Sequence, residues 1–198
     1  MVYMFLAAGF EEVEALCPLD LCRRAGIDVT TVGVGGQYVT GSHGITVKAD
    51  VSEADTVFPA GRVPGDLDGV ILPGGMPGTE NLYASPSVLS ALGAAEKSGK
   101  MIAAICAAPS VPGRLGMLGG RRAVCYPGFE EKLLGASVPD GERVVRDGNF
   151  ITGVGMGAAL EFGLAVVAYY KGAKSAASLS DGVLAPAGLS ECFGDCGK

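Results

Sequence analysis

Short apolar runs recur along this chain and alternate with segments of helical character. The runs cover residues 2–7, 27–34, 68–72 and 101–105, and the intervening helices are expected at about 10–24, 86–98 and 157–170. Strands that are apolar throughout are typical of parallel sheets, because helices cover both faces of such a sheet. The alternation therefore predicts an α/β fold, namely a flavodoxin-like, doubly wound sandwich with a mostly parallel sheet.

The remaining segments predict smaller elements around this sheet. Residues 35–50 alternate and turn, which predicts a hairpin with its tip at 41–44. We expect a further strand at 122–126, a short helix at 128–134, and a hairpin over 143–151 that turns at Asp147-Gly148.

The charge and hydropathy of the chain exclude several classes of partner. Its 198 residues carry a net charge of −6 and no block of lysine and arginine, which argues against a nucleic-acid partner. The apolar N-terminus lacks a basic segment and reads as a first strand, not as a signal peptide. The apolar stretch at 162–170 is too short to cross a bilayer, which takes ~20 residues. We expect a soluble cytoplasmic protein with no membrane partner.

Cysteine and histidine counts restrict the chemistry. The six cysteines, without a secretion signal, indicate reduced thiols and not a disulfide framework. His43 is the single histidine, so a histidine-rich zinc site is excluded. Any cysteine–histidine pair would have to use His43, which lies in a predicted hairpin tip.

Three candidate functional segments follow predicted strands. They are residues 9–14, Gly74-Gly75, and Cys106 with the small Ala107 after it. In a doubly wound sheet these strand ends lie at one edge, where ligands bind. A cysteine at a strand-to-helix turn lies near a helix N-terminus, which lowers the thiol pKa. A buried, inert cysteine is nevertheless the commoner fate of this residue type.

Glu14 strengthens the functional interpretation of Cys106. It flanks a helical stripe of Val13, Cys17 and Leu21 that we expect to be buried. A carboxyl group near the core must be partnered or protonated. A protonated Glu14 could donate a hydrogen bond to a thiolate, whereas an ionised Glu14 would raise the cysteine pKa.

Several motifs, in order and at compatible spacing over residues 1–185, resemble the ThiJ/PfpI superfamily and within it the protein-deglycase branch. They are GFEEVE at 9–14, RRAG at 23–26, LPGG at 72–75, IAAICAAP at 102–109 and EFGLA at 161–165. The resemblance implies a homodimer with a flavodoxin-like fold of the class I glutamine amidotransferase type.

The resemblance also implies a function and a site. Cys106 is then the nucleophile and Glu14 its protonated partner, while Gly75 and Ala107 offer oxyanion N–H groups and Gly74 shapes the loop. Some relatives carry a histidine at the position of Ala107 or of Tyr126, and this chain does not. Tyr126 and Arg24 are candidate substrate-pocket residues.

The leading hypothesis is a cysteine-dependent enzyme that needs no cofactor or metal and acts on small reactive carbonyls or glycated adducts. One alternative is a non-enzymatic redox sensor or redox-regulated chaperone. The other is a cysteine peptidase or amidase, which is weakened because His43 is its only candidate base.

Two further motifs are not expected to carry the chemistry. Residues 153–158 nearly match a dinucleotide-binding fingerprint, but they follow a late hairpin and lack a suitably placed acid, so close helix packing is favoured. Cys192 and Cys196 lie in a tail, predicted as 186–198, beyond the single domain predicted as 1–185. Two thiols are too few for a closed zinc site. The alternatives for them are a redox pair or an incidental flexible tail, and the second is favoured.

Overall fold

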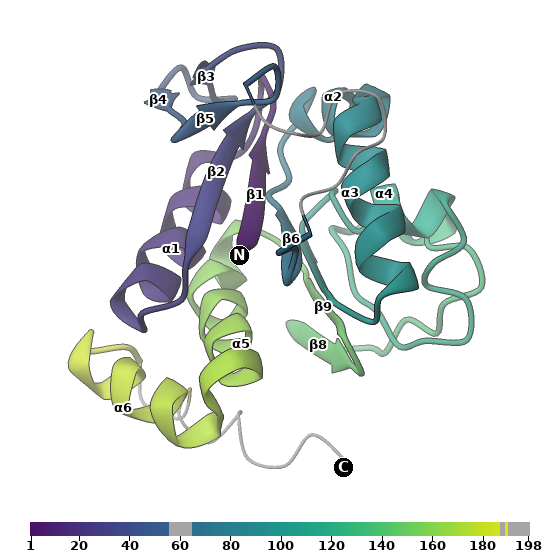
Figure 1. Ribbon diagram of the computed structural model, residues 1–198. Helices are drawn as coiled ribbons and strands as arrows, with labels where there is room; N and C mark the ends of the chain where they lie inside the picture. Colours follow the sequence, from purple (N-terminus) through teal and green to yellow (C-terminus); the bar gives the residue numbers. More distant parts are fainter. Residues whose placement is uncertain (56–64, 187–188, 190–198) are drawn as a thin grey trace.

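The computed structural model describes residues 1–55, 65–186 and 189 of the chain and shows a layered α/β architecture (Figure 1). Its strands are β1 (Val2–Leu6), β2 (Val29–Gly33), β3 (Tyr38–Thr40), β4 (Thr46–Lys48), β5 (Val51–Ser52), β6 (Gly69–Leu72), β7 (Met101–Ile105), β8 (Val144–Asp147) and β9 (Phe150–Gly153). Its helices are α1 (Glu12–Arg24), α2 (Gly78–Ala84), α3 (Pro86–Lys97), α4 (Ser110–Arg114), α5 (Ala159–Lys171) and α6 (Ala173–Gly182), with 3₁₀ turns at Glu130–Lys132 and Met156–Ala158.

Seven strands form one sheet in the order β5-β2-β1-β6-β7-β9-β8. Every pairing in it is parallel except that of β8 with β9. β1, β6 and β7 are neighbours at its centre, so their carboxyl ends meet at one edge, as the sequence predicts. β3 and β4 form the separate predicted hairpin.

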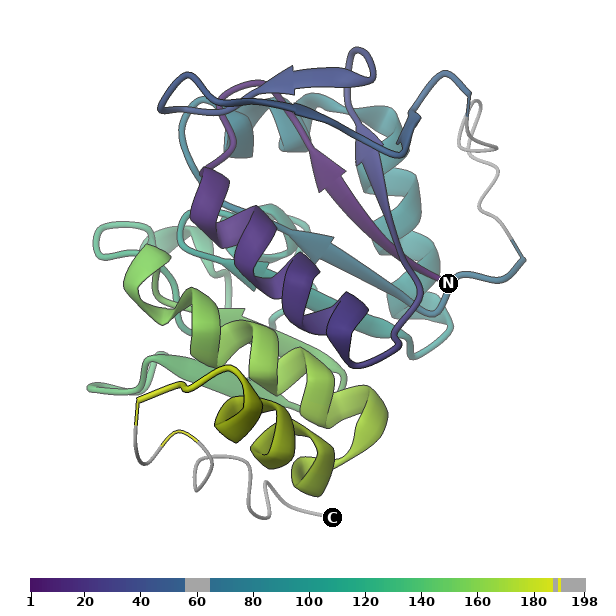
Figure 2. The ribbon, with the colours of Figure 1, turned by 90° about the vertical axis from the view of Figure 1, so that its left-hand side faces the viewer.

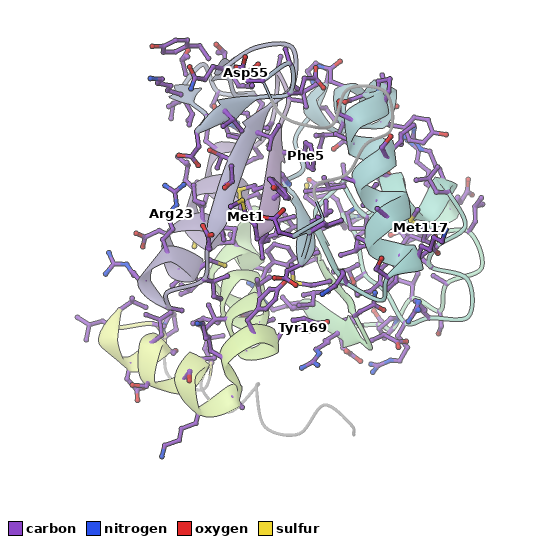
Figure 3. All side chains as sticks on the ribbon, viewed as in Figure 1. Met1, Phe5, Arg23, Asp55, Met117 and Tyr169 are labelled. Atoms are coloured by element: carbon purple, nitrogen blue, oxygen red, sulfur yellow. The ribbon has the colours of Figure 1, made fainter. Side chains whose placement is uncertain are left out.

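Side chains of the central strands alternate between two apolar layers. In β1, Met4 and Leu6 pack in the layer of α1 and α5, whereas Tyr3 and Phe5 pack in the layer of α2 and α3. Figure 3 labels Phe5 in this interior, and Figure 2 shows α5 beside α1 with α6 beyond it. Both faces of the sheet are therefore buried, which explains why these strands are apolar throughout.

Two local predictions need correction. Residues 122–126 form no strand, because only an isolated bridge joins Arg122 to Ser137 and Val124 donates its N–H to the Thr152 hydroxyl. The helix predicted at 128–134 is a single 3₁₀ turn, Glu130–Lys132. At 122–126, contacts that are distant in sequence override local propensity.

No helix in the described ranges is long and apolar enough to cross a membrane. The tail with Cys192 and Cys196 lies outside the described residues, and the predicted boundary at residue 185 stays a prediction.

Candidate active site

The candidate site lies at the carboxyl edge of the sheet, where Cys106 follows β7 directly. Cys106 has a φ of 64°, a left-handed conformation that costs a non-glycine residue of order 1–3 kcal/mol. Two backbone hydrogen bonds hold this turn. The Cys106 N–H donates to the Gly153 carbonyl at 2.8 Å, and its carbonyl accepts from the Tyr126 N–H at 2.8 Å. The strand-to-helix turn expected at Cys106 is therefore present, and its backbone is strained into a sharp elbow.

Glu14 reaches the cysteine from the first turn of α1. Its side chain is buried with the residue 1% exposed, and it hydrogen-bonds the thiol of Cys106. The Gly74 N–H donates to Glu14 Oε2 at 3.0 Å. A Cβ added at Gly74 would lie 2.7 Å from both the Cys106 Cβ and Glu14 Oε2, so only glycine fits between the two groups.

The carboxyl and the thiol share a proton near neutral pH. Burial raises the pKa of Glu14 to about 7, a shift in the direction of the protonated carboxyl expected from sequence. Burial and the neighbouring Glu14 carboxylate raise the pKa of Cys106 to about 12, in the direction opposite to the lowered pKa expected at a helix N-terminus. Because the second proton leaves only at high pH, the pair carries one negative charge between these values. A thiolate therefore requires the shared proton to stay on Glu14.

Two backbone N–H groups, those of Gly75 and Ala107, donate to the sulfur of Cys106 and lower its pKa. They lie where the sequence analysis expected oxyanion donors. Gly75 has a φ of 88°, and a Cβ there would lie 2.4 Å from the Glu11 nitrogen. Glycine therefore lets this N–H approach the sulfur while its loop packs against the start of α1.

The two predicted pocket residues are placed differently. Tyr126 is half exposed, and its ring is 3.4 Å from a Cβ added at Gly155, which in turn lies 4.0 Å from Glu14 Oε1. Tyr126 thus lies beside the site. Arg24 is the last residue of α1, about 15 Å along the helix from Glu14, and it pairs with Asp20. The structure does not bring Arg24 to Cys106 within the chain, and its role stays a prediction.

The buried stripe expected on α1 needs a correction, since Val13 is 45% exposed. Cys17 is half buried and Leu21 is buried. Glu14, one residue further along than Val13, turns inward instead because α1 packs against both α5 and the sheet.

His43 is bound to a different glutamate, Glu12. His43 Nδ1 lies 2.9 Å from Glu12 Oε2, and the His43 backbone N–H donates to Glu12 Oε1 at 2.8 Å. The hydrolytic alternative required His43 to act as a base on Cys106, and the ring is engaged with Glu12 instead. The sequence did not predict this pairing, because 31 residues separate Glu12 from His43.

Glu12 and His43, together with Glu11, form the only group of side chains in the described ranges that lie close enough together to bind a metal ion. Ligand atoms of Glu11, Glu12 and His43 lie within 4.8 Å of one another. The Glu12 carboxylate, however, already accepts from the N–H groups of His43 and Ile45. The cluster is therefore explained by contacts within the chain.

The glycine-rich segment at 153–158 lies beside the site. Gly153 ends β9 and accepts the Cys106 N–H, while Gly155 lies against Tyr126. The sequence analysis assigned this segment to close helix packing and did not foresee that Gly153 fixes the backbone of Cys106. Of the four described cysteines, all free, Cys22 and Cys125 are buried and Cys17 and Cys106 are half buried.

Comparison with known proteins gives the family. Residues 1–169 match the DJ-1/PfpI family. The chain belongs to this family. It is 37% identical to protein dj-1beta of Drosophila melanogaster over 91% of this chain and 95% of the relative. It is 38% identical to the Parkinson disease protein 7 homolog of Danio rerio, over 89% of this chain and 92% of that protein.

A relative named deglycase, from Pyrococcus horikoshii, is 32% identical over 77% of this chain and 89% of its own length. Among solved structures, Drosophila melanogaster DJ-1beta has a TM-score of 0.84 and 34% identity, covering 93% of this chain and 97% of that chain. An oxidised DJ-1 of Toxoplasma gondii has a TM-score of 0.80 and 31% identity, covering 93% and 97%. These relatives confirm the flavodoxin-like α/β fold predicted from sequence.

Proposed function

We propose that this member of the DJ-1/PfpI family is a cysteine-dependent enzyme that acts on small reactive carbonyls or glycated adducts. The observation that carries the proposal is the Cys106 elbow, where a hydrogen-bonded Glu14 and the N–H groups of Gly75 and Ala107 surround one sulfur. The relative named deglycase supports the same chemistry.

With methylglyoxal, the Cys106 sulfur adds to the aldehyde carbon and forms a C–S bond. The carbonyl electron pair moves onto oxygen, which takes the proton of Glu14 and gives a hemithioacetal. The ionised Glu14 then accepts the proton of the carbon that bears sulfur, and the electron pair of that C–H bond moves onto the ketone oxygen, producing an enediolate.

Glu14 returns this proton to the neighbouring carbon, while a hydroxyl proton passes between the two oxygens. The product is a lactoyl thioester on Cys106, and water hydrolyses it to lactate and the free thiol. The sum is one methylglyoxal and one water converted to lactate and a proton, so no redox partner is consumed.

The backbone donors have a defined part in this sequence. The Gly75 and Ala107 N–H groups are aimed at the place where negative charge resides, first on sulfur and then on the adjacent oxygen. Fixed donors of this kind stabilise such charge because they need no reorganisation. Gly74 excludes any side chain from between the carboxyl and the thiol.

The test is lactate release from methylglyoxal by the wild type and by Cys106→Ser. We expect the variant to lose at least 10²-fold in rate. Cys17→Ser is a matched control, because Cys17 is also half buried but lies on α1. Equal lactate release from wild type and Cys106→Ser would refute the proposal.

A second candidate is oxidation sensing, which the oxidised Toxoplasma gondii relative supports. A peroxide oxygen would transfer to the Cys106 thiolate, giving a sulfenate and water or an alcohol, and a second peroxide would give the sulfinate. A protonated Glu14 would donate a hydrogen bond to the new oxygen. Graded peroxide followed by mass spectrometry tests this candidate. Oxidation of Cys17 before Cys106 would contradict it.

The family resemblance also implies a homodimer. Val13 and Leu16, exposed apolar residues on α1, support a subunit contact there. Light scattering on the wild type and on Leu16→Glu tests this proposal. A wild type that is monomeric at micromolar concentration would refute it.

A further inference from the structure

Glu12 is the second buried carboxyl group of α1, and the proposed reaction does not use it. Its side chain is 4% exposed and lies under the hairpin tip that joins β3 to β4. Oε1 accepts N–H groups of His43 and Ile45 at 2.8 and 3.3 Å, and Oε2 faces His43 Nδ1 and Ser42 Oγ at 2.9 and 3.4 Å. A buried charge with this many donors fixes the segment that supplies them.

The tip is shaped to receive this carboxylate. A Cβ added at Gly41 would lie 2.4 Å from the Glu12 carboxyl carbon, so glycine permits the close approach. The Gly41 N–H donates to the Ile45 carbonyl at 2.9 Å and closes the tip around it. The imidazole of His43 is 69% exposed and covers the carboxylate from outside.

The tip also holds the loop before α1. The Gly9 N–H donates to the Thr40 carbonyl at 2.8 Å, and the Ser42 N–H donates to the Phe10 carbonyl at 2.7 Å. Together with the Glu12 contacts, these bonds bind residues 9–12 to the hairpin on two sides.

The loop at 9–11 in turn packs against the oxyanion loop. The Glu11 N–H donates to the Gly74 carbonyl at 2.9 Å. Gly75 lies so close to this loop that an added Cβ would be 2.4 Å from the Glu11 nitrogen. The peptide between Gly74 and Gly75 therefore has one face on the loop at 9–11 and donates its N–H to Cys106 on the other.

We infer that Glu12, which is hydrogen-bonded to His43, is a positioning residue that holds the Gly75 N–H against the sulfur of Cys106. It acts through the hairpin tip and the loop at 9–11 and contacts neither sulfur nor substrate. The inference rests on Cys106 being the reactive group of the proposed function, but not on the identity of the substrate.

Position and charge make opposite predictions for a substitution at Glu12. If Glu12 acted on Cys106 through its negative charge, its neutralisation would lower the pKa of the thiol. If it acts by positioning, Glu12→Gln weakens the contacts between α1 and the hairpin tip. The hydrogen bond from the Gly75 N–H to the Cys106 sulfur is then weaker, and the pKa of the thiol rises. The carboxylate that acts directly on Cys106 is Glu14, and Glu11 acts on Glu14.

The experiment is the pH–rate profile of Cys106 alkylation by iodoacetamide, followed by mass spectrometry on the full-length chain. We expect Glu12→Gln to raise the pH at which alkylation of Cys106 is half-maximal by at least half a pH unit. At a fixed pH below this midpoint, the alkylation rate should then fall about threefold. His43→Gln keeps the carboxylate and should shift the midpoint in the same direction by less. Glu96→Gln, at an exposed position on α3, is the matched control and should superimpose on the wild type.

A Glu12→Gln profile that coincides with the wild type, or moves to lower pH, overturns the inference. Should Glu12→Gln fail to fold by circular dichroism, His43→Gln decides alone, since its side chain is mostly exposed; an unshifted profile then overturns it. Methylglyoxal turnover is measured separately. A shifted profile without lactate formation refutes the proposed activity alone, whereas lactate formation with an unshifted profile refutes only the positioning role.

Discussion

Glu12 and Glu14 lie two residues apart on α1, and both are buried, yet their pKa values are shifted in opposite directions. Hydrogen bonds from the hairpin tip lower the pKa of Glu12 to about 2 against the opposing effect of burial, which is the larger single contribution. Glu14 receives one backbone N–H, from Gly74, and the thiol, so burial prevails and its pKa rises to about 7. Burial alone therefore does not decide the state of a carboxyl group. The number of donors around it does.

This difference separates two regions at one sheet edge. Around Glu12 the carboxylate is a permanent charge that organises a hairpin. Around Glu14 the carboxyl can gain and lose a proton near neutral pH, which suits a proton shuttle. Each substitution below tests one side of this contrast.

Activity should distinguish the two carboxyl groups most strongly. We expect Glu14→Gln to lower lactate formation from methylglyoxal by at least 10²-fold, because an amide cannot shuttle a proton. Glu12→Gln should lower it only several-fold. Steady-state rates at pH 7 measure both. Equal losses of activity in the two variants would contradict the assignment of proton transfer to Glu14 and of positioning to Glu12.

Gly74→Ala should disrupt the packing between Glu14 and Cys106 and lower the stability of the protein. The new methyl group would overlap the Cys106 Cβ and Glu14 Oε2, and overpacking of this kind costs typically 1–3 kcal/mol. Gly93→Ala is the control, since no atom lies within 4 Å of a Cβ there and α3 gains about 1 kcal/mol of helix propensity. Urea unfolding measures both changes. A Gly74→Ala variant as stable as wild type would show that the site relaxes freely.

The pH dependence of stability should have opposite slopes for the two groups. The lowered pKa of Glu12 contributes stability that is present above the unfolded-state pKa of ~4.3 and is lost as pH falls toward about 2. The raised pKa of Glu14 favours folding below ~4.3, and this contribution is lost as pH rises to about 7.

Urea midpoints from pH 3 to 8 check these slopes. Glu12→Gln should abolish the low-pH rise, and Glu14→Gln should abolish the fall toward neutrality. If both variants retained both slopes, other groups would control the pH dependence.

His43→Gln should give the smallest effect. Glu12 raises the pKa of His43, so protonated His43 contributes stability below its unfolded-state pKa of ~6.5, and this is lost as pH rises through the raised pKa. The ring is solvent exposed, so the difference in melting temperature between variant and wild type should be small and confined to the acid side. A larger difference above pH 8 than below pH 6 would contradict this assignment.

Much of the fold could be predicted from local pattern. The apolar strands at residues 2–7 and 101–105 and the hairpin turn at Asp147-Gly148 are short-range features, and the structure confirms them. Residues 122–126 were wrongly predicted as a strand, because their backbone N–H groups have other partners: Ala123 donates to the Ser137 carbonyl, Val124 to the Thr152 hydroxyl and Tyr126 to the Cys106 carbonyl.

The candidate site divides in the same way. Cys106 and Gly74-Gly75 follow strands, so topology alone places them at one edge. The engagement of His43 by Glu12 was not predicted, because 31 residues separate the two and nothing local signals the contact. Gly153 was likewise assigned to packing, although it fixes the backbone of Cys106.

The sequence by itself determined the alternation of strands and helices, the edge at which Cys106 lies, and the absence of a second histidine to assist it. Each depends on residue type and on spacing along the chain. Only the tertiary structure decided which of two neighbouring glutamates is a fixed charge and which can exchange a proton. That choice depends on how many N–H groups from distant segments reach each carboxyl, and such contacts have no counterpart in local sequence.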